Sequence, residues 1–545
     1  MRLQRHRRVP IALGMCLFGL SLLPGAVPLR ASPPSLIILI TSEQFRSDYL
    51  QLYEDSLSAG GLGRLLAEGA VYATARYDHL ATLSGPNAAV LATGAYPTDH
   101  GIIANRWYDW PSRQVMNATE PGPARDAPIA SPLRLTGSTF ADELRLATGG
   151  RSRVLAVSGS AEGAIFLAGR RPTGCYWMRS DGAFRTSKYY RPALPGWVEE
   201  FNALHSALRA QGRRWIAVGR SDDSVPLRVM SGGAEGDTAA LYRASPFALR
   251  DTLALALRAV EAEGLGQGDQ PDLLIVNLAA PARLAAETGA YSPLMRDMIL
   301  QLDRGLGTFF EGLDQMLGME NVGVVFTGLH GVAPLPETIR AEGLSAGRVR
   351  GEDVVTTIDA KLRESFGAQI YIEKFVYPHV YLSAATRKAA LARRTAILRA
   401  AGEAAQSLAG VAGYFSPETG GSTVSGESRI LQSWHPDRAG DLVLVYEPFF
   451  AEDFGGGRGT TWGSYYRYDT DVPLIFHGTG FRPGRNHAVA DAADIAPTLS
   501  SWLGIAQPSS ATGKVLADAL LPRAATEFMD SGFVGPPPPA PAPFP

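Results

Sequence analysis

The sequence is poor in cysteine, with Cys16 and Cys175 the only two among its 545 residues. Cys16 lies in an N-terminal apolar segment that we expect to be removed, so the mature chain would keep Cys175 alone and could form no intrachain disulfide. A chain of this length buries enough apolar surface to fold as one elaborated domain without such crosslinks. Its stability therefore has to come from its core.

Excess charge of one sign is also lacking. The formal net charge is -2, and 46% of the residues are hydrophobic, as in an ordinary globular protein. A dedicated nucleic-acid binder normally shows a basic excess, so we expect no nucleic-acid partner. After the N-terminus, no stretch has the roughly 20 consecutive apolar residues that span a bilayer. We therefore expect no stable membrane span in the mature chain.

The N-terminus itself resembles an export signal. Four arginines in the first eight residues precede the apolar run Ile11 to Leu23, and small residues suited to cleavage follow, up to Ala31-Ser32. This pattern predicts a signal peptide over residues 1–31 and a periplasmic or secreted protein. An uncleaved N-terminal anchor is the alternative.

Short apolar runs alternate with amphipathic segments along the rest of the chain. The runs predict strands buried on both faces of a sheet, and the segments between them predict helices. Such alternation is typical of a doubly wound α/β fold, with a largely parallel sheet and helices on both faces. The expected strands are Leu36 to Ile40, Val154 to Val157, Leu273 to Val276, Val322 to Phe326, Leu442 to Val445 and Val472 to Phe476, and the expected helices are Leu62 to Glu68, Asn87 to Thr93, Pro246 to Glu263, Leu294 to Leu317 and Thr386 to Leu408.

Two regions fit the alternation poorly. Residues from about 170 to 245 are rich in Arg, Gly, Trp and Tyr, and those from about 335 to 440 mix helical segments with polar loops. We expect both to be insertions that cap one end of the sheet in a single domain over residues 32–534. Residues 535–545 are rich in proline and predict a disordered tail.

Polar residues follow the first expected strand and open the second expected helix. Glu43 comes directly after the strand, and sites in open α/β sheets form beyond the carboxyl ends of strands. Ser84 precedes Gly85-Pro86 at the start of a helix, where free N–H groups favour an anion. A solvent-exposed carboxylate at Glu43 and a plain helix N-cap at Ser84 are the alternatives.

The segments Thr82 to Gly94 and Pro97 to Asp109 resemble the alkaline phosphatase and nucleotide pyrophosphatase (type I phosphodiesterase) superfamily, most closely its phosphate-irrepressible alkaline phosphatases. The resemblance implies an alkaline-phosphatase-like fold with Ser84 at the nucleophile position and Asn105 at a position that contacts the phosphoryl group. Further matches follow in order along the chain, among them Leu194 to Val198, Thr460-Thr461, Tyr468 to Pro473 and Asp494 to Leu499.

The departures from this family fall on its metal ligands. The resemblance implies two zinc ions held by six side chains together with the nucleophile. Glu43 stands in place of an Asp, His330 is kept, and the other four positions carry side chains without donor atoms: Ala282, Ala286, Leu329 and Trp462. Neither a methyl group nor an indole ring donates a lone pair to zinc, which takes four N, O or S ligands. One site could keep Glu43, Ser84 and His330.

Two further positions are changed. The family carries a Lys and an Arg that stabilise phosphoryl oxygens where this chain has Ser160 and Glu162. A carboxylate in place of a guanidinium reverses the charge beside a bound phosphate. Without metals Ser84 has no obvious base, since the spacing gives no support for a triad with His79 or His100.

We therefore expect a pseudoenzyme: an exported homologue with a degenerate two-metal site and little or no phosphatase activity, which acts as a ligand-binding or scaffold protein. It would use no cofactor, or at most one divalent metal such as zinc, and its partner would be a small molecule or a phosphate ester. The alternative is a metal-dependent phosphomonoesterase or phosphodiesterase with Ser84 as nucleophile and Glu287 or Asp471 as substitute ligands. A pocket lined by aromatic side chains is a further hypothesis, with packing of the old cavity as its alternative: Trp107, Trp462, Tyr465 and Tyr466.

Overall fold

The computed structural model describes residues 33–120, 129–231, 235–453 and 456–521, which belong to one compact unit. The predicted signal peptide and the proline-rich tail lie outside these residues. No helix within these ranges is both long enough and apolar enough to cross a bilayer.

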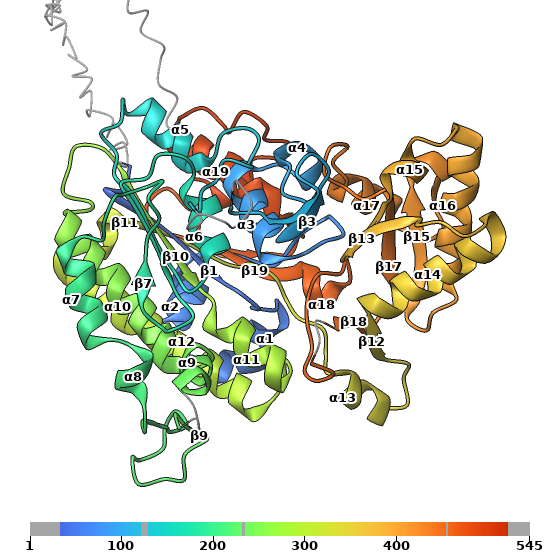
Figure 1. The fold of residues 1–545 in the computed structure, drawn as a ribbon. Helices are drawn as coiled ribbons and strands as arrows, with labels where there is room; N and C mark the ends of the chain where they lie inside the picture. Colours follow the sequence, from blue (N-terminus) through green and yellow to red (C-terminus); the bar gives the residue numbers. More distant parts are fainter. Residues whose placement is uncertain (1–32, 121–128, 232–234, 454–455, 522–545) are drawn as a thin grey trace, which may run out of the picture. The chain divides into compact units, whose positions relative to one another are not determined.

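The centre of this unit is a mixed, largely parallel sheet with strand order β20-β2-β19-β11-β1-β10-β5-β6-β7 and with β21 paired to β2 (Figure 1). Strand β1 runs parallel to both β10 and β11, whereas β19 runs antiparallel to its neighbours β11 and β2. The strands are β1 Leu36–Ser42, β2 Ala70–Arg76, β5 Val154–Ser158, β6 Gly174–Met178, β7 Phe184–Arg185, β10 Asp272–Leu278, β11 Val322–Gly328, β19 Asp471–His477, β20 Gly484–Asn486 and β21 Ala490–Asp491.

Helices cover both faces of this sheet. Side chains of β1 alternate between two apolar clusters, with Leu36, Ile38 and Ile40 in one cluster and Ile37 and Leu39 in the other. The first cluster includes residues of α2 Leu62–Glu68, α9 Glu235–Arg243, α10 Pro246–Glu263, α11 Ala280–Thr288 and α12 Pro293–Leu317, and the second includes residues of α3 Ser84–Thr93, α5 Phe140–Ala147, α6 Ala161–Ala168 and α19 Ile495–Leu503. Burial on both faces explains why the strands are continuously apolar.

A separate antiparallel sheet is built from residues between about 370 and 450, in the order β13-β14-β17-β15-β16. Its own apolar cluster includes α14 and α16. The elements of this region are β12 Gly347–Arg350, α14 Gly351–Phe366, β13 Ile372–Val376, β14 His379–Leu382, α15 Ala384–Arg387, α16 Leu391–Gln406, β15 Val411–Ser416, β16 Gly421–Ser422, α17 Glu427–Ser433, β17 Leu442–Tyr446 and β18 Phe450–Asp453.

This second sheet corrects two sequence predictions. The run Leu442 to Val445 is a strand, but it lies in the antiparallel sheet rather than in the central sheet, because apolarity alone does not say which sheet covers a strand. The helix expected over Thr386 to Leu408 is broken after Arg387. At the break, the guanidinium of Arg394 donates a hydrogen bond of 2.8 Å to the Arg387 carbonyl, which a continuous helix would have paired.

Shorter elements join these layers. They are α1 Asp48–Tyr53, α4 Pro97–His100, β3 Arg106–Asp109, β4 Gln114–Asn117, α7 Gly196–Leu204, α8 Ala207–Ala210, β8 Arg214–Trp215, β9 Arg228–Val229, α13 Pro336–Ala341 and α18 Arg467–Thr470. Strands β3 and β4 form one hairpin, and β8 and β9 form another.

Candidate functional site

Ser84 is the first residue of α3, and the position that caps this helix is Leu83. The Ser84 hydroxyl interacts with the side chains of Glu43 and His330, and the residue is 4% exposed. The plain N-cap alternative is therefore wrong. Because every residue of α3 is buried, the helix is held firmly and its first hydroxyl has a fixed position.

The Ser84 hydroxyl lies between two side chains that follow neighbouring strands. Its Oγ is 3.3 Å from Oε2 of Glu43, which follows β1, and 3.3 Å from Nε2 of His330, which follows β11. Since β1 and β11 are parallel neighbours, their carboxyl ends meet at one edge of the sheet. The structure thus brings together the three residues Glu43, Ser84 and His330, which we call the polar half of the site.

Glu43 is 5% exposed and is held by further hydrogen bonds. Its Oε1 accepts from the Ser160 hydroxyl at 2.5 Å and from Nδ2 of Asn277 at 2.9 Å. Asn277 lies in β10 and accepts in turn from the Thr41 hydroxyl at 2.8 Å. Sequence reasoning missed Asn277, although one amide within the apolar run of β10 was the available signal. These bonds compensate the burial of a carboxylate.

His330 is buried and neutral at physiological pH. Its Nδ1 lies 2.7 Å from the Gly331 carbonyl, which can only accept, so Nδ1 carries the proton and Nε2 offers a lone pair to the Ser84 hydroxyl. Burial lowers the pKa of His330 to about 4, against the opposing effects of the Glu43 charge and the Gly331 hydrogen bond. A base this weak is protonated little at neutral pH and gives Ser84 little activation.

The other half of the site is apolar, and we define it by Ala282, Ala286 and Trp462. Ala282 and Ala286 lie one turn apart on α11, and the Ala286 carbonyl accepts from the backbone N–H of Thr460 at 2.8 Å, two residues before Trp462. The indole of Trp462 stacks on the His330 ring, with centroids 4.4 Å apart and planes at 14°. The indole therefore covers one face of the imidazole and fixes the orientation of its ring.

Leu329, next to His330, belongs to the apolar core. Its side chain is fully buried in the cluster behind α3, and its carbonyl accepts a hydrogen bond of 2.7 Å from the Asn87 side chain. The two carboxylates considered as substitute ligands are engaged elsewhere, Glu287 with Arg228 at 2.8 Å and Asp471 with Arg76 at 2.7 Å. Within the described ranges no group of three or more His, Cys, Asp or Glu side chains is arranged to hold a metal.

Asn105 is tied to the beginning of α3. Its Oδ1 accepts a hydrogen bond of 2.7 Å from the backbone N–H of Gly85. Asn105 therefore lies beside Ser84 and uses its carbonyl oxygen to satisfy one of the free N–H groups of the helix.

Of the four aromatic residues expected to line a pocket, Trp107 is buried in the core, and Tyr465 and Tyr466 pack against each other with ring centroids 4.9 Å apart. Trp107 is 1% exposed and packs in the core between the guanidinium groups of Arg134 and Arg438, each 5.4 Å from its ring. The Tyr466 hydroxyl donates to the Tyr446 carbonyl at 2.8 Å. Trp462 packs on His330, so the site has one aromatic wall.

The remaining nearby histidines do not reach the hydroxyl. Nδ1 of His100 accepts from the backbone N–H of Ile102 at 3.1 Å, and the His79 ring lies against Tyr77 and Tyr96. Burial lowers the pKa of His79 to about 4. Neither histidine hydrogen-bonds Ser84 within the part of the chain that is described.

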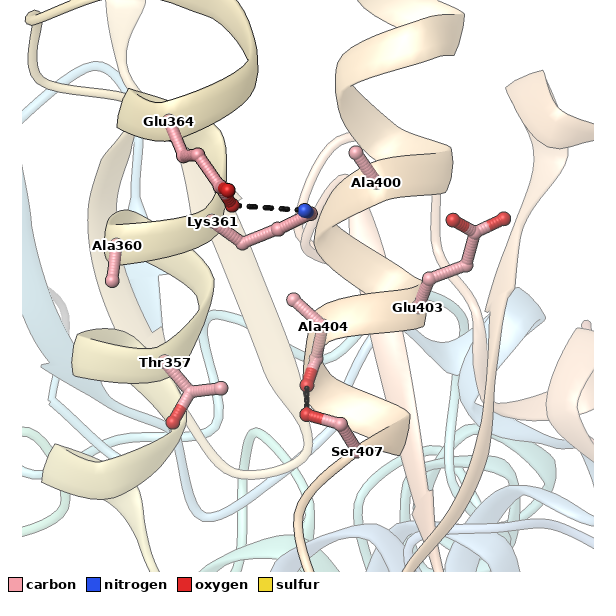
Figure 2. A pocket seen from close by; sticks show the side chains of 8 residues that line it. All are labelled: Thr357, Ala360, Lys361, Glu364, Ala400, Glu403, Ala404 and Ser407. Atoms are coloured by element: carbon pink, nitrogen blue, oxygen red, sulfur yellow. Dashed lines mark hydrogen bonds and ion pairs between the residues drawn. The ribbon is translucent and has the colours of Figure 1, made fainter.

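Two cavities bear on the question of a ligand. A cavity of about 300 Å³ adjoins the polar half at Ser160 and is lined by Glu162 and by four arginines. A hollow of about 470 Å³ lies between α14 and α16 (Figure 2). Lys361 and Glu364 form an ion pair of 2.9 Å at its rim, and its lining includes no residue of the Ser84 site.

Comparison with known proteins agrees with this architecture. The profile of the family described as type I phosphodiesterase / nucleotide pyrophosphatase matches residues 37–451. Alkaline phosphatase PafA of Elizabethkingia meningoseptica is 29% identical over 91% of this chain and 96% of its own length. Alkaline phosphatase PhoV of Synechococcus elongatus is 28% identical over 91% of this chain and 95% of its own length.

The solved structures give the same result. The crystal structure of wild-type alkaline phosphatase PafA superposes with a TM-score of 0.81 at 28% identity, covering 90% of this chain and 99% of that one. The similarity extends over both sheets, since nearly all of the relative is covered. The chain is therefore a member of the type I phosphodiesterase / nucleotide pyrophosphatase family, with an alkaline-phosphatase-like fold.

Proposed function

We propose that this protein has lost two-metal phosphoryl transfer and acts by binding a ligand in the remains of the site. The observation that carries the proposal is the set of side chains around Ser84. Three positions where the family resemblance calls for zinc ligands hold Ala282, Ala286 and Trp462, and none of the three has a donor atom.

The polar half offers too few donors for two zinc ions. Glu43 and His330 are its metal-binding side chains apart from the hydroxyl, and Oε1 of Glu43 already accepts two hydrogen bonds. Nε2 of His330 faces Ser84 under the Trp462 ring. The residues present do not fit a two-zinc centre, so no phosphoryl-transfer step is derived through one.

Charge around the hydroxyl supports the same proposal. Phosphoryl transfer depends on stabilising negative charge, yet the carboxylates of Glu43 and Glu162 lie on this side of the sheet. Burial raises the pKa of Glu162, and the Glu43 charge raises it further, whereas the charge of Arg283 lowers it. Ser84 is left as a neutral alcohol beside negative charge.

A metal-dependent phosphomonoesterase or phosphodiesterase with a reduced site is the second candidate. The convergence of Glu43, Ser84 and His330 favours it, because three donors around one point can hold one divalent ion such as zinc. Ser84 would then be the nucleophile. We rank it second because Ser160 and Asn277 compete for Glu43 and because three donors are one fewer than the four ligands that zinc takes.

Export forms part of the proposal and is supported by the sequence of residues 1–31, with its basic start and apolar run. The mature protein would be periplasmic or secreted. Edman sequencing of protein secreted from a native-type host should give an N-terminus near residue 32, and recovery of intact Met1 in the membrane fraction would favour an uncleaved anchor.

The test is metal content combined with turnover. Protein purified from zinc-supplemented medium is assayed for bound zinc and for hydrolysis of a chromogenic phosphate ester, in parallel with Ser84→Ala. We expect less than one zinc per chain and a background rate that Ser84→Ala does not change. Stoichiometric zinc with turnover abolished by Ser84→Ala would overturn the proposal in favour of the second candidate.

A further inference from the structure

Three arginines from different elements converge on the outer surface of the layer that contains α10 and α12 (Figure 1). Arg213 precedes β8, and its guanidinium lies over the Phe247 ring at 4.0 Å. Arg250 stands one turn after Phe247 on α10 and donates a hydrogen bond of 2.5 Å to Oε1 of Gln301 on α12. Arg304 follows Gln301 by one turn of the same helix. The three guanidinium groups therefore belong to one surface, which we call the arginine patch.

The arginine patch faces solvent without an acidic partner. Its three residues are exposed, and within the described ranges none of them forms an ion pair. The neighbouring carboxylates of Asp251 and Asp297 are buried and already engaged. Asp251 lies 2.8 Å from Nδ1 of His205, and Asp297 accepts a hydrogen bond of 2.6 Å from the indole of Trp215. These two carboxylates therefore serve the interior and leave the arginines free to bind an external anion.

The charges of the patch act on one another. Partial burial lowers the pKa of Arg250, and the charges of Arg213 and Arg304 lower it further, whereas those of Asp297 and Asp251 raise it. Like charges held on one surface repel one another and create a positive potential. Bound anions would relieve this repulsion.

Exposed leucines lie beside the arginine patch. Leu204 and Leu208 are 70% and 61% exposed, at the end of α7 and in α8. Between them His205 contacts Asp251, the residue that follows Arg250, so this part of the chain borders the patch. A basic surface with exposed aliphatic side chains at its border is typical of proteins that lie on an anionic membrane.

The surface is open and fits an extended partner better than a small one. Neither of the two cavities described above is lined by its arginines or its leucines. Guanidinium groups pair with phosphate oxygens, and exposed leucines are stabilised by contact with acyl chains. A layer of phosphate groups over apolar chains satisfies both, whereas a free anion satisfies only the arginines. Glu200, an exposed carboxylate one turn before Leu204, is an opposing charge at the border.

We propose that the arginine patch, together with Leu204 and Leu208, binds the surface of an anionic phospholipid membrane. Lipid phosphate groups would pair with the three arginines, and the two leucines would enter the boundary between headgroups and acyl chains. This inference goes beyond the ligand-binding role proposed above, because none of these residues belongs to the Ser84 site.

The test is sedimentation of the exported protein with vesicles of phosphatidylcholine alone and with vesicles that also contain phosphatidylglycerol. We expect binding to the anionic vesicles, and we expect added salt to weaken it. Arg213→Gln/Arg250→Gln/Arg304→Gln should weaken this binding by about a hundredfold, since each arginine near an anionic membrane contributes about fivefold. All proteins compared have the same N-terminus, so residues 1–31 contribute equally to each, whether cleaved or kept.

Two further variants control for charge and for folding. Arg393→Gln/Arg399→Gln/Arg482→Gln removes three exposed positive charges from other elements and should change binding by less than about twofold. The lysine version of the patch variant keeps the charge and should keep most of the binding. Far-ultraviolet circular dichroism shows whether each variant is folded.

Leu204→Ser/Leu208→Ser tests the apolar contact. This variant should bind the anionic vesicles about tenfold more weakly and keep the salt dependence of the wild type. Leu146→Ser is its control, because Leu146 is 71% exposed on α5, a helix of the opposite layer, and this change should leave binding unaltered.

Several results would overturn the inference. Equal binding to neutral and anionic vesicles would exclude the arginines as its cause, and equal losses in the two arginine-to-glutamine variants would exclude this surface. Binding to polyglutamate without binding to vesicles would indicate an acidic protein partner in place of a membrane. Unaltered affinity in Leu204→Ser/Leu208→Ser would contradict the insertion of the leucines.

Discussion

The two halves of the Ser84 site differ in how their side chains are satisfied. In the polar half, Glu43 and His330 keep donor atoms and turn them toward Ser84 and toward neighbouring amides and hydroxyls. In the apolar half, Ala282 and Ala286 have only methyl groups, and Trp462 has an indole that packs on His330. Polar atoms left without a metal need hydrogen-bond partners, whereas a vacated ligand position needs only to be filled.

Both needs would have to be met if the metal donors were lost, as proposed above. The polar half is a hydrogen-bond network tied to β10 through Asn277, and the apolar half is packed. On this proposal the region is stable without a bound ion, because each half is satisfied internally.

Restoring donors to the lost ligand positions should have the largest effect. The variant Ala282→Asp/Ala286→His/Leu329→Asp/Trp462→His is expected to bind about two zinc ions and to raise phosphate-ester turnover by roughly a thousandfold or more, since metal ions contribute several kcal/mol to such transition states. Zinc analysis and steady-state rates measure this. The control carries Asn, Gln, Asn and Phe at the same positions. If the fourfold variant folds but binds no more zinc than the wild type, the polar and apolar halves no longer surround a shared metal-binding position.

Removing the carboxylate at the centre of the polar half should cost stability. Glu43→Ala takes away the acceptor for Ser160 and Asn277 in a buried place, and should lower the free energy of unfolding by about 2 to 3 kcal/mol. Glu287→Ala removes an exposed partner of Arg228 and should change the free energy of unfolding by less than about 1 kcal/mol. Urea denaturation followed by fluorescence compares the two, and equal costs would mean that Glu43 is not part of a tight network.

The dependence of stability on acid pH can be compared for His330 and for His379, a buried histidine of β14. Burial lowers the pKa of His330 to about 4 and that of His379 to about 3. Because the unfolded chain takes up these protons near pH 6.5, each histidine reduces stability as the pH falls from 6.5 toward its folded pKa. One such histidine lowers the free energy of unfolding by about 2 kcal/mol as the pH falls from 6.5 to 5.

The variants separate the two histidines. Both nitrogens of His379 lack a hydrogen-bond partner within the described chain. His379→Phe should therefore reduce the loss of unfolding free energy below pH 6.5, which we call the acid limb, without lowering stability at pH 7.5. His330→Phe should flatten the limb equally but cost stability at pH 7.5, because Ser84 and Gly331 lose their partner. Urea titrations at half-unit pH steps measure both effects. An unaltered acid limb in His379→Phe would contradict the assignment.

The smallest effect is expected for the hydroxyl itself. Ser84→Ala removes a side chain whose two hydrogen bonds are long, at 3.3 Å each, and should change stability by about 1 kcal/mol or less. Thermal denaturation followed by circular dichroism measures the change. A much larger loss would mean that Ser84 is a structural centre of the polar half rather than a vestigial nucleophile.

Much of the architecture could be predicted from the sequence. The central strands were visible because strands buried on both faces are continuously apolar, and α10 was predicted with its observed bounds because proline opens it and glycine follows it. The run Leu442 to Val445 was assigned to the wrong sheet, since β17 is buried like a central strand. At the helix break after Arg387, the freed carbonyl accepts a hydrogen bond from the Arg394 side chain, a contact that no periodicity reveals.

The site could be predicted in part. Glu43, Ser84 and His330 were chosen from a motif and from their places after strands, and they lie together. The role of Asn277 could not be predicted, because it depends on residues more than 100 positions away that only the folded sheet brings near. The stacking of Trp462 on His330 is of the same kind.

The central claim, that the Ser84 site no longer holds two zinc ions, is tested most directly by anomalous diffraction at the zinc edge from crystals grown with zinc. We predict no anomalous peak within about 2.0 to 2.3 Å of the Ser84 hydroxyl, the Glu43 carboxylate or Nε2 of His330. A zinc ion at that hydroxyl with four or more protein donors would contradict the account.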